Sequence, residues 1–454
     1  MSGIDNLMLA LNQPGPPPVI TGCFEFEGRL DLNRVSALVE KRLLCHDRFS
    51  MLPSRRTGRG TWARHKTVDL TYHLCRTPLS PPGGKKQLRK LFSELSADPL
   101  DPERPLWRIH YIENIGSGGS ILFFRIHHCI ADGMALVNLL LSITENESGT
   151  TESRLNGKHP VGRNPASGRR QCHKACDFAK RKIKSIARDP VHARKCAGKM
   201  RTALSETAMT IARVLMLPPD RHYFSATPPG NHREMAWSAP LPLDEIKKTG
   251  ARFNATVNDV IVALIAGGIR RHLRKRCDLE SMPPLRMAVP VNIRPAGTDR
   301  EPGIELKNEF GFVLAPLPVS IKDPVRRIRR VHAILEKLKQ SSDPSAAWAG
   351  MNALGAAPAE VAVKTAHLFA EKITGIISNV PGPDRPLHFA GGKLKGIRFW
   401  LPLIKGMGIG VSAFSYNNAV SLGIVTDAGM VPDPDAIARH IEEEFKAILK
   451  KKAD

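Results

Sequence analysis

The sequence predicts an α/β protein with two α/β halves joined by a long basic connector, and three observations lead to this prediction. Short apolar runs typical of strands alternate with helical patterns over residues 1–145, and again over residues 221–454. Between them, residues 146–220 are first polar and then strongly basic. The 454 residues, 42% of them apolar, provide enough apolar material for two or three domain cores.

The first half ends in a strand pattern followed by a helix pattern. Residues 120–126 are almost entirely apolar, as in a buried strand, and residues 133–141 form an apolar helical stretch. Residues 145–170 are rich in Gly, Ser, Asn and Pro, which is typical of a loop. We therefore expect the first half to end near residue 145.

The connector carries much of the positive charge. Residues 175–217 have a helical pattern interrupted by Pro190. Residues 151–220 contain sixteen Lys and Arg and only five Asp and Glu, so they hold nearly half of the formal charge of +24. Two interpretations stay open: a solvated helix that crosses the other domains, or a helix that lies on an anionic membrane surface.

The second half has clear helix and strand signals of its own. We expect a helix over residues 256–273 with Thr256 as its cap, and a strand over residues 286–291. Further helices are expected over 324–338 and 434–450, with a pair of strands within 409–427. No repeat of 20 to 50 residues is visible, which argues against a solenoid.

Composition also limits the compartment and the partners. The eight cysteines are scattered and the N-terminus lacks a signal-peptide pattern, so we expect reduced thiols in the cytoplasm. No apolar run approaches the roughly 18 residues of a membrane span. The charge is compatible with nucleic acid, an anionic membrane or a polyphosphate ligand. No nucleic-acid-binding signature appears and the connector has few aromatic residues, so nucleic acid is not expected.

Other chemistries lack support. Cys172, His173 and Cys176, with His192 and Cys196, lie at helical spacing, but they do not match the tighter cysteine pairs of zinc sites. No metal is therefore expected. No G-x-S-x-G motif occurs, and the glycines around Gly406 match neither a Walker loop nor a complete dinucleotide fingerprint.

The sharpest motif is HHxxxDG, formed by His127, His128, Asp132 and Gly133 between the predicted strand and helix. A histidine at the mouth of a strand can keep a free ring nitrogen, and its pKa near neutrality suits it to take a proton from a hydroxyl. His128 is the candidate base. We expect His127 to pack or to bond structurally, and Asp132 to cap the helix or to pair with an arginine.

Together with further motifs, HHxxxDG makes nearly the whole chain resemble the bacterial wax ester synthase/acyl-CoA:diacylglycerol acyltransferase family, within the CoA-dependent acyltransferases and condensation domains. Pro105, Leu106 and Trp107 resemble its PLW motif, and Asn258 and Asp259 resemble its ND motif. Three more segments stand in the expected order, at residues 290–294, 378–383 and 415–417.

The resemblance implies two chloramphenicol-acetyltransferase-like halves with the active site in a tunnel between them. It also implies that His128 deprotonates an alcohol, which attacks the thioester of a fatty acyl-CoA without a covalent acyl-enzyme. No metal or redox cofactor is implied, because the thioester already supplies a leaving group. In related folds the motif aspartate pairs with an arginine, for which Arg294 is a candidate here.

Some assignments keep two interpretations. Asn258 or Asn308 could donate a hydrogen bond to the developing oxyanion, or could cross-link helices. Trp107 could contact ligand, although core packing is the favoured interpretation. The chain departs from the family at its opening, where Gly3-Ile4-Asp5 replaces a Ser-Pro-Leu-Asp pattern, and at Lys307-Asn308, where the family has Gly-Asn.

The sequence therefore predicts an O-acyltransferase that joins fatty acyl-CoA to diacylglycerol or a long-chain alcohol. Because substrates and products are water-insoluble, peripheral contact with an anionic membrane or lipid droplet is expected. The alternative is a condensation-type or non-catalytic acyl-binding module with a different acceptor. The chain has no fused carrier segment, which favours free acyl-CoA.

Overall fold

The computed structural model describes most of the two α/β halves. The described residues are 1–12, 16–57, 59–65, 67–116, 118–145, 216–220, 229–230, 232–274, 276–280, 282–294, 306–339, 341 and 343–451. The loop expected over 145–170 and the helix expected over 175–217 lie outside these residues, except for their outer ends. The two interpretations of the connector therefore stay predictions.

The first sheet has six strands in the order β12-β13-β1-β6-β5-β4. Its strands are β1 (Val19–Phe26), β4 (Leu74–Arg76), β5 (Trp107–Ile115), β6 (Gly119–His127), β12 (His388–Phe389) and β13 (Gly392–Trp400). Neighbouring strands are antiparallel except β4 and β5, which run parallel. A separate hairpin pairs β2 (Met51–Thr57) with β3 (Arg59–Arg64).

The second sheet has the order β10-β9-β11-β14-β15-β7, with β8 paired to β15. Its strands are β7 (Arg233–Trp237), β8 (Leu241–Pro242), β9 (Leu285–Asn292), β10 (Phe310–Leu317), β11 (Gly375–Val380), β14 (Ile409–Tyr416) and β15 (Ala419–Asp427). The central strand β11 runs parallel to β9 and β14, and its Gly375, Ile377 and Val380 are buried while the residues between them are only partly buried.

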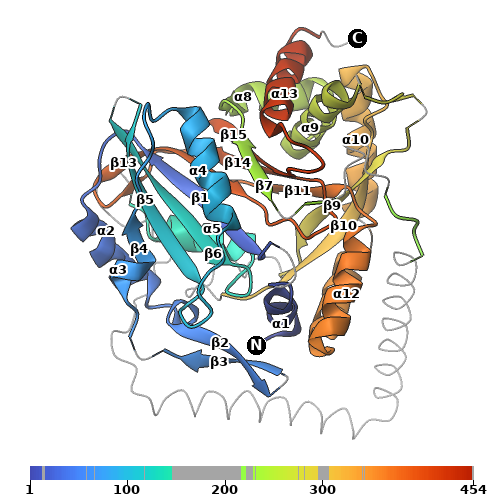
Figure 1. Cartoon of the computed structure of the whole chain (residues 1–454). Helices are drawn as coiled ribbons and strands as arrows, with labels where there is room; N and C mark the ends of the chain where they lie inside the picture. Colours follow the sequence, from blue (N-terminus) through green and yellow to red (C-terminus); the bar gives the residue numbers. More distant parts are fainter. Residues whose placement is uncertain are drawn as a thin grey trace, which may run out of the picture.

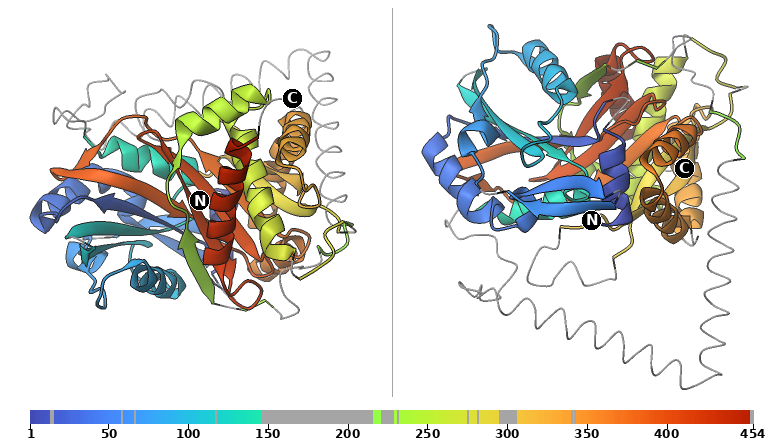
Figure 2. Two further views of the ribbon diagram at one scale, coloured as in Figure 1. Left: turned by 90° about the horizontal axis from the view of Figure 1, so that it is seen from above. Right: turned by 60° about the horizontal axis from the view of Figure 1, so that its bottom comes forward.

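Helices cover both sheets. They are α1 (Gly3–Ala10), α2 (Leu32–Leu38), α3 (Leu70–His73), α4 (Lys85–Ala97), α5 (Gly133–Ser142), α8 (Leu243–Arg252), α9 (Val257–Leu273), α10 (Pro324–Lys339), α11 (Asp343–Ala356), α12 (Ala359–Ala370) and α13 (Pro434–Leu449). Helix α9 is almost wholly buried and contacts α8, α10 and α13. In the left view of Figure 2, α13 lies across the second sheet.

The local predictions are confirmed. Strand β6 and helix α5 occupy the expected places, and Thr256 caps α9 through a reciprocal hydrogen-bonded pair with Asp259. Strands β14 and β15 form a hairpin whose turn residues Asn417 and Asn418 have φ of 45° and 59°, as a tight hairpin turn requires. Helices α10 and α13 agree with prediction to within a residue.

The two halves exchange structure, which the division at residues 145 and 221 does not anticipate. Strand β13 lies far along the second half of the chain, yet it pairs with β1 and completes the first sheet (Figure 1). Helix α4, from the first half, packs on β7 of the second sheet. The exact domain boundaries stay a prediction.

Helix α1, from the first half, also packs on helices of the second half. The right view of Figure 2 shows α1, in dark blue, beside the orange helices of the second half, and its contacts are with α11 and α12. Gly3 and Gly355 make this approach possible, because a Cβ on Gly355 would lie 1.6 Å from the Gly3 carbonyl oxygen.

Within the described ranges, no single helix is long and apolar enough to cross a membrane. Helices α8 and α9 together reach the length and apolar composition of a membrane span, but they are bent by 98° relative to each other.

Candidate active site

The HHxxxDG motif lies where β6 ends and α5 begins. His127 is the last residue of β6 and is 1% exposed. Its Nδ1 accepts a hydrogen bond from the Cys129 backbone N–H at 3.1 Å, so the proton of the neutral ring must sit on Nε2, 3.0 Å from the Asn12 Oδ1. Burial lowers the pKa of His127 to about 3. Both ring nitrogens are thus engaged within the protein, as expected for a structural histidine.

His128 has one nitrogen engaged and the other available. Its Nδ1 lies 3.1 Å from the Oδ1 of Asn308. The Nδ2 of Asn308 donates to an Asp5 carboxylate oxygen at 2.8 Å and to the His128 carbonyl at 2.9 Å, which uses both amide hydrogens. The amide oxygen therefore faces His128, so Nδ1 carries the ring proton. The lone pair on Nε2 is left for chemistry.

The ring of His128 stays neutral at neutral pH. Burial is the largest influence and lowers the pKa of His128 below its ordinary value. The carboxylates of Asp132 and Asp5 act in the opposite direction, because negative charge stabilises the imidazolium. A neutral imidazole with a free Nε2 is the form that a general base requires.

Asp132 is held by three groups and reaches no ring nitrogen of the motif. Its Oδ1 caps α5 through the Ala135 backbone N–H at 2.9 Å. Its Oδ2 accepts from Arg294 at 2.6 Å and from the Glu309 backbone N–H at 3.0 Å. The proposed arginine pair is confirmed, and Gly133 opens the helix with no atom within 4 Å of its Cβ position.

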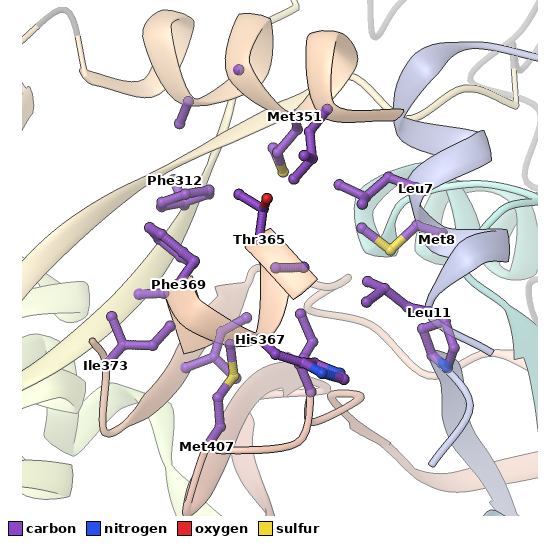
Figure 3. Close-up of a pocket in the computed structure, with 18 of the residues that line it drawn as sticks. Leu7, Met8, Leu11, Phe312, Met351, Thr365, His367, Phe369, Ile373 and Met407 are labelled. Carbon is purple, nitrogen blue, oxygen red and sulfur yellow. The ribbon is translucent and has the colours of Figure 1, made fainter. Parts of the chain in front are cut away.

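His128 lines an apolar cavity of about 660 Å³. Figure 3 shows Leu7 and Met8 of α1, with Leu11 at its C-terminal cap, on one wall, across from Phe312 and Phe369. The Phe312 and Phe369 rings lie 5.0 Å apart. Further lining comes from the small residues of α11 and the loop before β14. Few polar side chains interrupt this surface: Asp343, Thr365, His367 and Lys405 with His128. The volume is within the range of small-molecule sites.

The PLW residues pack next to the HHxxxDG motif, at the start of β5. Trp107 is fully buried, its ring stacks on His73 at 4.2 Å between centroids, and its indole N–H donates to the Phe49 carbonyl at 2.9 Å. The Leu106 carbonyl accepts the His127 backbone N–H at 3.0 Å, and Pro105 borders a second, smaller cavity. Core packing is therefore the observed role of Trp107.

The ND residues lie at the start of α9, and the structure does not bring them to His128. The Oδ1 of Asn258 accepts a hydrogen bond from Asn379 at 3.1 Å. Asp259 is fully buried, its carboxylate accepts a hydrogen bond from the backbone N–H of the cap residue Thr256 at 2.8 Å, and it contacts the His332 Nδ1 at 2.8 Å. Neither residue lines the apolar cavity. Asn258 thus cross-links α9 to β11. Both amide hydrogens of Asn308 are donated to Asp5 and to the His128 carbonyl.

Two supports of the site, Asp5 and Arg48, are not among the residues that the sequence predicts for it. Asp5 belongs to the opening that departs from the family pattern, and Ser2 and Asp5 form a reciprocal cap of α1. The Ser-x-x-Asp spacing is the local signal of such a cap. Nothing local indicates that the same carboxylate reaches Asn308, 303 positions away, or that Arg48 bonds the backbone after His128.

Among the described residues, no group of three or more His, Cys, Asp and Glu side chains could hold a metal ion. The candidate ligands Cys172, His173, Cys176, His192 and Cys196 lie outside these residues. The five described cysteines are free, and they are Cys23, Cys45, Cys75, Cys129 and Cys277.

Comparison with known proteins first defines the class. The fold matches the wax ester synthase/diacylglycerol acyltransferase of Marinobacter aquaeolei VT8 with a TM-score of 0.64 and 22% identity, covering 98% of this chain and 97% of that one. It also matches the first condensation domain of the calcium-dependent antibiotic synthetase, with a TM-score of 0.61 and 13% identity over 100% and 96% of the two chains. The fold is thus one shared by acyltransferases and condensation domains.

Sequence comparison then identifies the family. Residues 1–261 match the wax ester synthase/diacylglycerol acyltransferase catalytic domain, and residues 306–449 match the C-terminal domain of the same family. Two Mycobacterium tuberculosis H37Rv proteins, provisionally named diacylglycerol O-acyltransferases, are 26% and 28% identical. They cover 99% and 89% of this chain and 90% and 88% of their own lengths. The chain belongs to the wax ester synthase/diacylglycerol acyltransferase family and is an acyltransferase.

Proposed function

We propose that the enzyme transfers a fatty acyl group from acyl-CoA to the hydroxyl of diacylglycerol or of a long-chain alcohol, with His128 as the general base. The products are triacylglycerol or wax ester. The observation that carries the proposal is the free Nε2 of a neutral His128 at the wall of a large apolar cavity. The names of the relatives and of the family support both acceptors.

The reaction needs one base and one leaving group. The acceptor hydroxyl gives its proton to the His128 Nε2 as its oxygen attacks the thioester carbonyl carbon. The tetrahedral intermediate then collapses, its C–S bond breaks, and the imidazolium returns the proton to the leaving thiolate of CoA. His127, Asp132 and Gly133 hold this geometry, and they take no proton themselves.

The cavity suits the acyl chain. Its walls are aliphatic or aromatic side chains from α1, α11, α12 and β10, which exclude water from the thioester and so disfavour hydrolysis. Lys405 lines the same cavity and is exposed, and the chain carries a formal charge of +24. This positive charge supports binding of the phosphates of CoA.

Peripheral contact with an anionic membrane or lipid droplet, on the cytoplasmic side, is part of the proposal. Both the acceptors and the products are insoluble in water, so they must enter and leave through a lipid phase. Val361 and Leu368 support this contact, because both are half exposed on α12, the helix that also supplies His367 and Phe369 to the cavity.

The test is thiol release from palmitoyl-CoA by the purified protein with hexadecanol, with diacylglycerol, or without acceptor. We expect acceptor-dependent release that falls by about 10²- to 10⁴-fold in His128→Gln, the usual contribution of a general base. The matched control is His232→Gln, which alters an exposed histidine of the second half and should keep full activity.

The same assay over a range of pH tests the protonation state. Because burial lowers the pKa of His128, activity should persist to pH values below the ordinary histidine pKa and fall only in more acid solution. Full activity in His128→Gln would remove the base from the proposal. Absence of release with either acceptor would favour the condensation-type or non-catalytic alternative.

A further inference from the structure

The Asp5 carboxylate does more than cap a helix. It lies on α1 in the first turn and is fully buried. Its Oδ2 accepts hydrogen bonds from the Ser2 backbone N–H at 3.1 Å and from Arg48 Nη2 at 3.0 Å. Its Oδ1 accepts the Asn308 amide at 2.8 Å. A helix cap needs only the first of these contacts, so the other two call for another explanation.

The contact with Asn308 fixes which way the amide points. An ionised carboxylate can only accept hydrogen bonds, so the NH₂ group of Asn308 must face Asp5. Its oxygen then faces the His128 Nδ1 at 3.1 Å. That oxygen can only accept, so the proton of the neutral ring is held on Nδ1. The lone pair that the reaction needs is left on Nε2.

Arg48 ties the same carboxylate to the backbone of the motif. Its Nη1 donates to the Cys129 carbonyl at 3.1 Å and to the Ile130 carbonyl at 2.7 Å, directly after His128. Asp5 therefore reaches the ring of His128 through Asn308, and its backbone through Arg48. One buried carboxylate thus contacts both the residue that bonds the ring and the residue that bonds the turn.

Helix α1 also forms a wall of the acyl cavity. Leu7 and Met8 follow Asp5 along α1, Leu11 caps its C-terminus, and all three line the same cavity as His128. Figure 3 shows these three side chains on one side of the cavity. The helix is held against the second half by the Ile4 backbone N–H, which lies 3.3 Å from the Asn352 Oδ1. One short element thus carries both the support for the base and part of the chain-binding surface.

We propose that Asp5 is a positioning residue that acts through Asn308 to fix the ring orientation and the Nδ1–H tautomer of His128. The proposal rests on the proposed role of His128 as base. It also makes a statement about His128 that is independent of catalysis, because the tautomer is a property of the resting enzyme.

The main variant is Asp5→Asn. If its side-chain oxygen takes the place that caps α1 and accepts from Arg48, its amide hydrogens oppose the NH₂ group of Asn308; if the oxygen faces Asn308 instead, the amide hydrogens oppose Ser2 and Arg48. In both orientations the charge is lost. We expect kcat to fall about 10- to 100-fold, the range expected when a hydrogen bond to a charged group is lost. The control is Ser2→Ala, which removes the other half of the cap and leaves the contacts of Asp5 with Asn308 and Arg48 in place.

Two readouts separate positioning from mere stability. The first is the pH profile of kcat, since loss of the negative charge should lower the pKa of His128 and move the acid limb to lower pH. Among the described residues, Asp132 and His127 also act on the His128 ring, Arg294 and Glu309 lie beside Asp132, and Arg48 bonds the backbone after His128. None of these groups is altered in the variant. The second is the ¹⁵N spectrum of histidine-labelled protein, with the His128 signals assigned by their loss in His128→Gln.

The expected spectrum of the parent enzyme has a protonated Nδ1 and a bare Nε2 at His128, and Asp5→Asn should mix the two tautomers. Asn308→Ala should do the same without touching the cap of α1, and the double variant should be no worse than Asn308→Ala alone. If Ser2→Ala and Asp5→Asn lost kcat equally, and the acid limb of the pH profile stayed in place, Asp5 would act only as a helix cap.

An Nε2–H tautomer in the parent enzyme would also overturn the proposal, whatever the kinetics. A failure of the proposed function can be recognised separately, because it would appear as full activity in His128→Gln. The spectra of Asp5→Asn and Asn308→Ala would still report the tautomer of His128 in that case.

Discussion

The adjacent residues His127 and His128 have the same side chain, and their neighbours give them different properties. Both ring nitrogens of His127 are hydrogen-bonded, one to the Cys129 N–H and the other to the Asn12 side chain, and burial lowers its pKa to about 3. His128 spends only Nδ1. The sequence predicted this division from the position of the motif, but the partners that create it come from distant parts of the chain.

The pair of Asp132 and Arg294 is a second feature decided by residue contacts. Arg294 follows β9 and donates to the Asp132 carboxylate at 2.6 Å and to the Lys307 carbonyl at 2.9 Å, and both charged side chains are largely buried. Since Asp132 also caps α5, the arginine fastens the segment after β9, in the second half, to the motif in the first half.

Replacing Arg294 by alanine should lower the free energy of unfolding by about 3 kcal/mol, because the Asp132 carboxylate is left buried without its counter-charge. Urea unfolding followed by circular dichroism measures this change. Arg439→Ala is the matched control, since it breaks an exposed ion pair with Asp433 and should cost less than about 1 kcal/mol. Equal effects in the two variants would contradict the assigned importance of the buried pair.

At the scale of elements, the helices and strands that the sequence predicts, such as β6, α5, α9 and the β14–β15 pair, are those with local signals. The Thr256 cap and the apolar run after it predict helix α9, and Asn417-Asn418 predict the turn of the β14–β15 hairpin. The role of α1 could not be predicted in this way. A capping box specifies where a helix begins, but it does not specify that the helix will cross α11 at two glycines.

Gly355→Ala tests the crossing of α1 and α11. In an exposed helix this change stabilises by about 0.5–1 kcal/mol, because alanine loses less entropy than glycine. Here the new Cβ would meet the Gly3 carbonyl oxygen at 1.6 Å, so α1 must move. We expect destabilisation by about 1–3 kcal/mol, together with loss of activity because Asp5 moves with α1.

The unfolding midpoint and the thiol-release rate, measured on the same preparation, check this prediction. Gly28→Ala is the control, since its Cβ would have no neighbour within 4 Å. A stabilised and fully active Gly355→Ala protein would show that α1 does not need this close approach.

At the scale of the whole molecule, the halves form one structure. Strand β13 completes the first sheet, and its Trp400 lies in a cluster of rings with Phe92, Phe123 and Trp237, contributed by both halves. The Trp400 indole N–H donates to the Ala236 carbonyl of β7 at 2.8 Å. The cavity depends on this arrangement, since its walls come from α1 of the first half and α11, α12 and β10 of the second.

The proposed lipid contact is a prediction about the whole surface. Vesicles containing phosphatidylglycerol should carry the protein upward in a flotation gradient, whereas pure phosphatidylcholine vesicles should carry less, because the charge of +24 favours an anionic surface. Val361→Ser with Leu368→Ser should reduce flotation on both, since the exposed apolar side chains of α12 are removed. Protein that stays at the bottom of every gradient would contradict the contact.

Periodicity and residues that are close in the chain predict the fold class, the HHxxxDG motif with its candidate base, and the positions of elements such as β6, α5 and α9. The family resemblance adds Arg294 as the candidate partner of Asp132, and the folded protein confirms that pair. Only the folded protein shows two other features: the place of β13 in the first sheet, and the chain of contacts from Asp5 through Asn308 to His128. The physical reason is that sheet edges and buried charges select partners by proximity in the folded protein. Positions 5, 128 and 308 become neighbours only when both halves have packed around one cavity.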